Sequence, residues 1–215
     1  MGKLKVALFD FDGVVVDTEP IYDIFWNEAG FRYGLGIENF ADIVKGTTLP
    51  YILETYFSDR TEEYRQMIAK ESTDYEKDMD FPPLPGSIEY IHLLKDQGVK
   101  VGLVTSSDDS KLVRAFKELN LSPEVFDTIV SADRITKGKP NPMCYLLAAK
   151  DLGVSPSDCI VFEDSFNGIK SATDAGMRVI GLSTSNPVES LQDKVFEVIP
   201  NFEHCTFEDY LRWQA

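Results

Sequence analysis

Cysteine is scarce in this sequence of 215 residues, and histidine is scarcer still. The cysteines, Cys144, Cys159 and Cys205, are odd in number, lie far apart and form no CxxC pair. This pattern indicates reduced thiols in a reducing compartment, so we expect a cytoplasmic protein without a disulfide framework. The histidines, His92 and His204, stand beside no motif, and we expect both to be structural.

Positive charge is also in short supply. The chain has 21 lysines and arginines against 36 aspartates and glutamates, which gives a formal net charge of −15. A protein this acidic repels the phosphate backbone of nucleic acids and the surface of anionic membranes. We therefore expect neither nucleic acid nor membrane as a partner, and the sequence leaves the oligomeric state open.

Long apolar runs are missing as well. The first apolar stretch is interrupted by Asp10, too early for a signal peptide or a membrane span. No later stretch is long enough for a span either, so the sequence predicts a soluble protein.

What the sequence has instead is a series of short apolar runs separated by helical patterns. The runs cover residues 5–11, 99–107, 126–132, 158–164, 177–183 and 195–200. Strands that are apolar on both faces and alternate with helices are typical of parallel sheets. The pattern therefore predicts an α/β fold with a Rossmann-like parallel sheet.

The stretch between the first strand and Gly86 breaks this rhythm. It contains no convincing strand and is far longer than an ordinary connection in such a fold. Its apolar residues follow helical spacing, and it ends in the proline-rich segment 80–86, which suits a linker back to the sheet. We therefore predict a helical cap of residues 17–82 inserted into a core of residues 1–16 and 83–215.

Two aspartates stand one residue apart where the first predicted strand ends, in the stretch ALFDFDGVVVDTEP. Because alternate residues of a strand share a face, Asp10 and Asp12 are expected to project in roughly the same direction. Turn chemistry could explain either residue alone, since Asp and Gly favour turns. Two like charges this close are costly unless a cation or a shared proton compensates them. The pair therefore predicts a bound metal or a carboxyl group that stays protonated.

Further polar residues end other predicted strands or precede a predicted helix. They are Glu163, Asp164, Thr105, Ser106, Ser107 and Lys139. Carboxylates in such a cluster suit Mg²⁺, and hydroxyl and N–H groups at a helix start can hold a phosphoryl oxygen. Each residue alone is more typical of a helix cap or an exposed charge. Their joint occurrence at strand ends favours a functional site.

Four motifs give the chain a resemblance to the haloacid dehalogenase superfamily, and within it to the β-phosphoglucomutase-like and sugar-phosphate phosphatase subgroup. The motifs are DFDGVVVDTEP, VTSS, GKPNP and EDSFNGIKSATDAG. Their order and spacing match the family over essentially the whole chain, and the predicted helical insert matches the family's cap. The resemblance implies the family's Rossmann-like core and an enzyme that works through an aspartyl-phosphate.

The resemblance also implies roles for the residues at the strand ends. Asp10 would be the nucleophile. Asp12 would be the general acid and base, so it must bind a proton at neutral pH, and its site should be shielded and rich in negative charge. The residues that would bind the phosphoryl group are Thr105, Ser106, Ser107 and Lys139.

Mg²⁺ is the cofactor that the resemblance implies. It would be held by a carboxylate oxygen of Asp10, the backbone carbonyl of Asp12 and Asp164. Glu163 would contribute either directly or through a water molecule. Together these residues predict a Mg²⁺-dependent phosphohydrolase that acts on a small phosphorylated metabolite. A sugar phosphate is the leading prediction for this substrate.

Two alternatives remain within the same fold. One is phosphoryl transfer as in a β-phosphoglucomutase, but the histidine and the cap arginine of those enzymes correspond here to Tyr22 and Leu49. The other is a non-catalytic binding protein, which would have no physical need for so costly an acidic cluster. Because dehalogenases lack the second aspartate of the first motif, Asp12 favours phosphoryl transfer over carbon–halogen cleavage.

Overall fold

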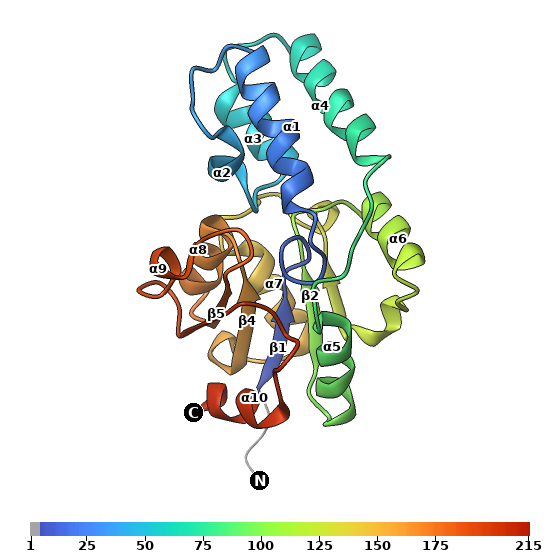
Figure 1. The fold of residues 1–215 in the computed structure, drawn as a ribbon, viewed down its shortest axis with the longest axis vertical. Helices are drawn as coiled ribbons and strands as arrows, with labels where there is room; N and C mark the ends of the chain where they lie inside the picture. The colour runs from blue at the N-terminus through green and yellow to red at the C-terminus, as the bar shows by residue number, and fades with distance from the viewer. Residues whose placement is uncertain (1–4) are drawn as a thin grey trace.

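Over residues 5–215, which are the residues it describes, the computed structural model shows a six-stranded sheet with helices on both faces and more helices beyond one end (Figure 1). The strands are β1 Val6–Phe9, β2 Val101–Val104, β3 Thr128–Val130, β4 Cys159–Glu163, β5 Arg178–Leu182 and β6 Glu197–Ile199. The helices are α1 Glu19–Arg32, α2 Phe40–Val44, α3 Leu49–Tyr56, α4 Glu62–Glu76, α5 Ser87–Asp96, α6 Asp109–Glu118, α7 Met143–Leu152, α8 Phe166–Asp174, α9 Val188–Leu191 and α10 Phe207–Gln214. Within these residues, none of the helices has the length and apolarity that a membrane span requires.

The strands lie side by side in the order β3-β2-β1-β4-β5-β6, and each neighbouring pair is parallel. The central strand β1 pairs with β2 on one side and β4 on the other, so that Phe9 lies opposite Leu103 and Phe162. Every residue of β1, β2 and β4 is buried, as expected for strands covered on both faces. The predicted α/β fold with a parallel sheet is confirmed.

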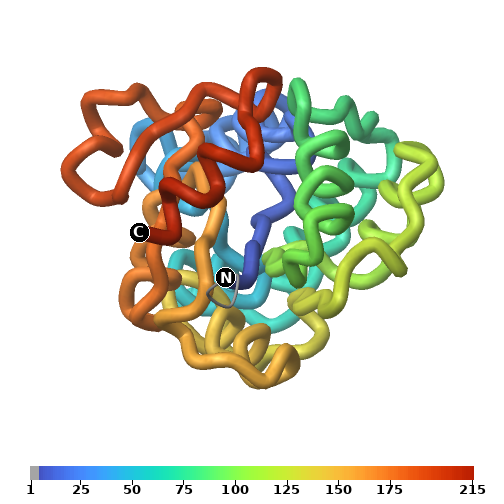
Figure 2. The backbone as a smooth tube through the Cα atoms, turned by 90° about the horizontal axis from the view of Figure 1, so that it is seen from below, coloured from blue at the N-terminus to red at the C-terminus, as the bar shows by residue number. Residues whose placement is uncertain are grey.

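Helices cover both faces of the sheet and exclude water from it. On one face α5, α6 and α10 pack around Phe9 and Phe162, and on the other α7 and α8 pack around Leu8 and Val161. Figure 2 shows the end of the sheet where β1 begins and α10 lies. There the side chain of Gln214 in α10 accepts a hydrogen bond from the Lys5 N–H at 2.8 Å. The apolar burial in these two layers is the main source of stability for the sheet.

Helices α1 to α4 form a cap with an apolar cluster of its own. Phe40 lies at its centre, with ring centroids 6.1 Å from Trp26 and 6.3 Å from Phe57. The helix α4 is capped by Thr61, the residue before it, whose hydroxyl accepts a hydrogen bond from the N–H of Tyr64. The cap stands beyond the carboxyl ends of the strands, which is where open α/β sheets bind ligands (Figure 1). The predicted helical insert is confirmed.

The chain enters and leaves the cap along two neighbouring segments. The N–H of Asp17 donates to the carbonyl of Pro82 at 2.8 Å, and the N–H of Leu84 donates to the carbonyl of Val15 at 2.9 Å. Val16 and Pro83 form an antiparallel bridge between these bonds. The entry and the exit of the cap are therefore paired with each other, while the predicted borders at residues 16–17 and 82–83 stay a prediction.

Candidate active site

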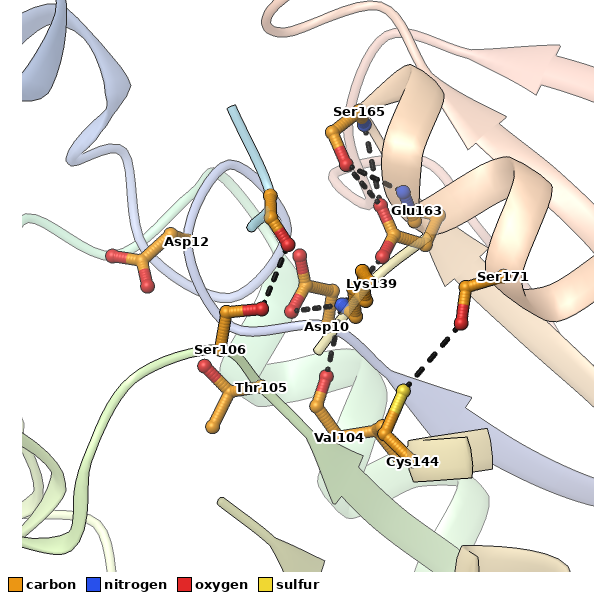
Figure 3. Close-up of polar contacts among 12 residues, drawn as sticks. Asp10, Asp12, Val104, Thr105, Ser106, Lys139, Cys144, Glu163, Ser165 and Ser171 are labelled. Atoms are coloured by element: carbon orange, nitrogen blue, oxygen red, sulfur yellow. Dashed lines mark hydrogen bonds and ion pairs between the residues drawn. The ribbon is translucent and has the colours of Figure 1, made fainter. Parts of the chain in front are cut away.

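Most of the predicted site residues meet at the carboxyl end of the sheet, beneath the cap (Figure 3). Asp10 directly follows β1, Glu163 is the last residue of β4, and Lys139 comes from the loop before α7. Their exposed fractions are 4% for Asp10, 0% for Glu163 and 1% for Lys139. Ionic groups buried this deeply need partners of opposite charge or a bound ion.

Lys139 is the cation at the centre of this group. Its Nζ lies 2.9 Å from Asp10 Oδ1 and 2.6 Å from Glu163 Oε1, and it donates to the carbonyl of Val104 at 3.3 Å. Burial alone would lower the pKa of Lys139, but the carboxylates of Asp10 and Glu163 hold it above its usual value. Lys139 is therefore positively charged at neutral pH and joins the ends of β1 and β4.

Glu163 has hydrogen-bond donors on both of its carboxylate oxygens. Oε1 accepts from Lys139 and from the hydroxyl of Tyr145 at 2.9 Å. Oε2 accepts from the N–H of Asp164 at 3.0 Å and from the N–H and hydroxyl of Ser165 at 3.2 and 3.1 Å. The carboxylate also lies against Gly168, where a Cβ would come within 1.7 Å of Oε1. Glu163 is thus fixed at the start of α8.

Asp164 differs from Glu163 because one of its carboxylate oxygens has no hydrogen-bond donor within the described part of the chain. Its Oδ2 accepts from the hydroxyl of Ser185, while the buried Oδ1 has no hydrogen-bond partner among residues 5–215. Carboxylate oxygens of Asp10, Glu163 and Asp164 lie within 4.8 Å of one another, close enough to hold a metal ion. A buried oxygen without a partner beside other carboxylates fits a cation as the missing partner.

The pKa values show the cost of bringing these acids together. Burial and the Glu163 carboxylate raise the pKa of Asp10 to about 8, although Lys139 acts in the opposite direction. Burial, together with the carboxylates of Glu19 and Glu163, also raises the pKa of Asp164 well above its usual range. The amount of negative charge in the site therefore exceeds what Lys139 alone can balance.

Asp12 lies in a different environment from the one predicted for it. Its Oδ1 is 2.6 Å from the Nζ of Lys111, and it also accepts hydrogen bonds from the hydroxyls of Thr18 and Ser107. Burial alone would raise the pKa of Asp12, but Lys111 and the two hydroxyls bring it below its usual value. The expectation of a site rich in negative charge that keeps a proton on Asp12 is wrong for this structure, because Lys111 supplies a buried positive charge.

The two aspartates also do not project together. The carboxylate of Asp10 faces Lys139, whereas that of Asp12 points away from it (Figure 3). The strand alternation behind that expectation holds only inside a strand, and β1 ends at Phe9. Beyond it residues 10 and 11 lie outside any strand, so the two-residue period no longer holds and the two side chains diverge.

Lys111 is a site residue that sequence reasoning missed. It lies in the first turn of α6, which is capped by Asp108, and the Asp108 side chain accepts a hydrogen bond from the Lys111 N–H. The first turn of a helix disfavours a cation because of the helix dipole. A lysine at that position therefore favours a nearby carboxylate, and its place in the first turn after Asp108 was the available sequence signal.

The hydroxyls after β2 are largely engaged with other protein groups. Thr105 Oγ1 accepts from the N–H of Ser107 at 3.0 Å, and Ser106 Oγ donates to the carbonyl of Gly46 in the cap at 2.7 Å. Ser107 Oγ donates to Asp12 at 2.8 Å. Ser106 thus ties the core to the cap and Ser107 contacts Asp12, while their role toward a phosphoryl group stays a prediction.

A cavity of about 320 Å³ lies between the core and the cap and reaches both aspartates of the first motif. Its cap side is formed in part by Tyr22, Lys45 and Leu49. The Nζ of Lys45 is 3.0 Å from Asp23 Oδ1 and 3.4 Å from Glu19 Oε2. Lys45 is therefore already shared between two carboxylates, and sequence reasoning did not anticipate this cluster.

Comparisons with known proteins place these motifs in a family. A family model described as haloacid dehalogenase-like hydrolase matches residues 7–182. Hexitol phosphatase A from Escherichia coli is 32% identical to this chain, over 95% of this chain and 94% of its own. The phosphorylated carbohydrates phosphatase from Thermotoga maritima is 30% identical, over 88% of each chain. The crystal structure of β-phosphoglucomutase from Clostridium difficile matches with a TM-score of 0.80 at 26% identity, covering 99% of this chain and 97% of that one.

Proposed function

We propose that this chain, which belongs to the haloacid dehalogenase-like hydrolase family and is a phosphatase of that type, dephosphorylates a small sugar phosphate through an aspartyl-phosphate on Asp10. The observation that carries the proposal is the buried group in which Lys139 lies 2.9 Å from Asp10, beside Glu163 and Asp164. Phosphoryl transfer depends on positive charge placed where negative charge develops, and this group holds such charge beside the nucleophile.

The proposed reaction has two steps. In the first, a carboxylate oxygen of Asp10 attacks phosphorus, the bond from phosphorus to the sugar oxygen breaks, and Asp12 protonates that oxygen. In the second, water attacks the aspartyl-phosphate and gives its proton to Asp12, which frees Asp10 and inorganic phosphate. Thr105, the N–H of Ser106 and Lys139 would hold the phosphoryl oxygens. The lowered pKa of Asp12 beside Lys111 suits the second step, and the charge of a bound phosphate would favour its protonation for the first.

The acidic group fits Mg²⁺ as the cofactor. Asp164 offers a buried oxygen without a protein partner, and Asp10 would share the ion together with the backbone carbonyl of Asp12. The protein donors on both oxygens of Glu163 favour a contact through water. When bound, Mg²⁺ would neutralise charge on the nucleophile and on the phosphoryl group. It would also keep Asp10 ionised, which the nucleophilic role requires.

Sugar phosphates are the substrate class that the relatives and the cavity support. Two of the proteins named above are called a hexitol phosphatase and a phosphorylated carbohydrates phosphatase. A cavity of about 320 Å³ suits a small metabolite, and polar groups of Asp23, Lys45 and Glu76 line it as partners for hydroxyls. We propose a cytoplasmic location, which the free Cys144 and Cys159 favour.

A panel of phosphate esters tests the proposed function. We expect inorganic phosphate to be released from hexose and hexitol phosphates in the presence of Mg²⁺. Excess chelator should lower the rate by about 10²-fold or more, because the acids around Asp10 lose their counter-charge. The measurement is kcat/KM for each ester, with nucleotides and pyrophosphate included. Activity that survives the chelator unchanged would contradict the Mg²⁺ mechanism.

A mutase activity is the second candidate, because a solved β-phosphoglucomutase shares the fold over nearly the whole chain. Leu49 and Tyr22 line the cavity at the positions where the resemblance places the arginine and histidine of those enzymes. We therefore expect β-glucose 1-phosphate with its bisphosphate to yield free phosphate rather than glucose 6-phosphate alone. A protein that binds neither Mg²⁺ nor beryllium fluoride would instead be a non-catalytic relative.

The effect of Mg²⁺ on thermal stability should depend on pH. From the ordinary carboxyl pKa up to about 8, folded Asp10 keeps a proton that the unfolded chain has released, so without metal stability falls as pH rises. The lowered pKa of Asp12 acts below this window. We expect Mg²⁺ to raise Tm by roughly 5 °C more at about pH 8 than at about pH 5.5, because the ion replaces the proton.

The control for this measurement is a carboxylate outside the site. Asp80→Asn removes an exposed acid and should keep the pH-dependent Mg²⁺ effect. Asp164→Asn should lose most of it. A Mg²⁺ effect on Tm that is equal at both pH values would refute the assignment of the ion to this cluster.

A further inference from the structure

Lys111 is a buried cation with a specific set of partners. Its Nζ lies 2.6 Å from Asp12 Oδ1 and donates to Ser107 Oγ at 2.9 Å, and the residue is only 5% exposed. Ser107 in turn donates to Asp12 Oδ2 at 2.8 Å. Lys111 and Ser107 therefore contact different oxygens of the same carboxylate and contact each other, which fixes the orientation of Asp12 from two sides.

The remaining side of the ammonium group faces aromatic rings. Its Nζ is 4.7 Å from the centroid of the Tyr22 ring and 5.9 Å from that of Phe11. An ammonium group has three N–H donors, and Asp12 and Ser107 accept from two of them. The face of an aromatic ring is a favourable partner for the third. The ring of Tyr22 thus completes the surroundings of Lys111.

Tyr22 belongs to the cap, whereas Lys111 belongs to the core. The Tyr22 hydroxyl donates to Glu76 Oε1 at 2.8 Å, which joins α1 to the last residue of α4. Arg114, one turn after Lys111 in α6, donates to the backbone carbonyl of Glu76. The contacts of α6 therefore run from Asp12 in the core to both of the long cap helices.

From these contacts, and resting on the proposed function, we propose that Lys111 is a positioning residue that holds the Asp12 carboxyl group toward the leaving oxygen, and that Tyr22 of the cap holds Lys111 in turn. Asp12 is then aligned only while the cap lies against the core. A substrate that closes the cap would thereby also align the acid that protonates its leaving oxygen.

The leaving group of the substrate separates this role from a purely structural one. A sugar oxygen must be protonated as it leaves, whereas p-nitrophenolate leaves without a proton. The value of kcat/KM reports the steps up to the breaking of the first phosphorus–oxygen bond, so it is independent of the later attack by water. A misaligned Asp12 therefore lowers kcat/KM for sugar phosphates and spares p-nitrophenyl phosphate.

The test compares Lys111→Met with wild type on p-nitrophenyl phosphate and on the sugar phosphate that gives the highest kcat/KM in the panel. We expect a loss of about 30- to 100-fold on the sugar phosphate and less than about threefold on the aryl ester. Lys117→Met, an exposed lysine in the same helix, is the matched control and should change neither value. Equal losses on both esters, or no loss, would overturn the proposal.

The contribution of the cap is tested with Tyr22. Tyr22→Leu removes the ring and should shift the ratio between the two esters in the same direction as Lys111→Met, by about fivefold to tenfold. Tyr22→Phe keeps the ring and should preserve that ratio. If Lys111→Met does not fold, the two Tyr22 variants decide the proposal alone. A wild-type protein that releases phosphate from no ester would defeat the proposed function, whereas an active one with an unshifted ratio defeats only this inference.

Discussion

Asp10→Asn is expected to release phosphate from sugar phosphates about 10⁴-fold more slowly than wild type, or not at all. The amide keeps the size of the carboxylate but has no negatively charged oxygen to attack phosphorus. Lys139 keeps its contact with Glu163 at 2.6 Å, so we expect the rest of the site to keep its arrangement. The measurement is kcat under saturating Mg²⁺ and substrate.

A folded, inactive variant is the informative result. Removing the charge of a carboxyl group whose pKa is raised should leave Tm unchanged or higher, since burial already disfavours the ionised form. The matched control is Asp17→Asn, an exposed aspartate of the same motif, which should keep wild-type activity. If Asp10→Asn retained a tenth of the wild-type kcat, Asp10 could not be the nucleophile.

Lys139→Met is expected to damage both stability and activity. The Lys139 side chain is 1% exposed, and methionine has a similar length. Asp10 and Glu163 nevertheless lose their shared cation. Breaking a buried ion pair by removing one partner costs about 3–5 kcal/mol of unfolding free energy. Activity should fall about 10³-fold, because a positive charge beside the transferring group is lost. Urea unfolding and kcat/KM measure the two effects.

The stability loss in Lys139→Met should also depend on pH. Lys139 is what counteracts the raised pKa of Asp10, so without the lysine Asp10 takes up a proton more readily, and in acid the defect is small. The defect should grow as pH rises and Asp10 releases this proton. Lys137→Met, an exposed lysine two residues earlier in the same loop, should show neither effect. A Lys139→Met variant as stable as wild type at alkaline pH would mean that the buried carboxylates do not need this cation.

The fold could be predicted from the sequence because its signals are local. Each buried strand appears as a short apolar run, and the absence of such runs before Gly86 indicates the helical insert. The acids after β1 and β4 were likewise expected to meet, since the carboxyl ends of parallel strands share one edge of the sheet. These conclusions need only residue spacing and a parallel sheet.

The rest of the site depends on contacts that spacing does not reveal. Lys111 meets Asp12 across 99 positions of sequence, and Lys45 meets Glu19 across the cap. Which lysine points inward is decided by how a helix is rotated against its neighbours, and one sequence carries little information about that rotation. For the same reason the charge around Asp12 was predicted with the wrong sign.

The paired entry and exit of the cap have a consequence for how such a protein can change. Val16 and Pro83 are bridged directly, so the whole cap is inserted at a single junction with the core and crosses no strand of the sheet. A longer, shorter or differently folded cap could be inserted at this junction without altering the register of β1 with β2 and β4. Because cap residues line part of the cavity, such a change would alter the contacts available to a substrate and leave the residues at the strand ends in place.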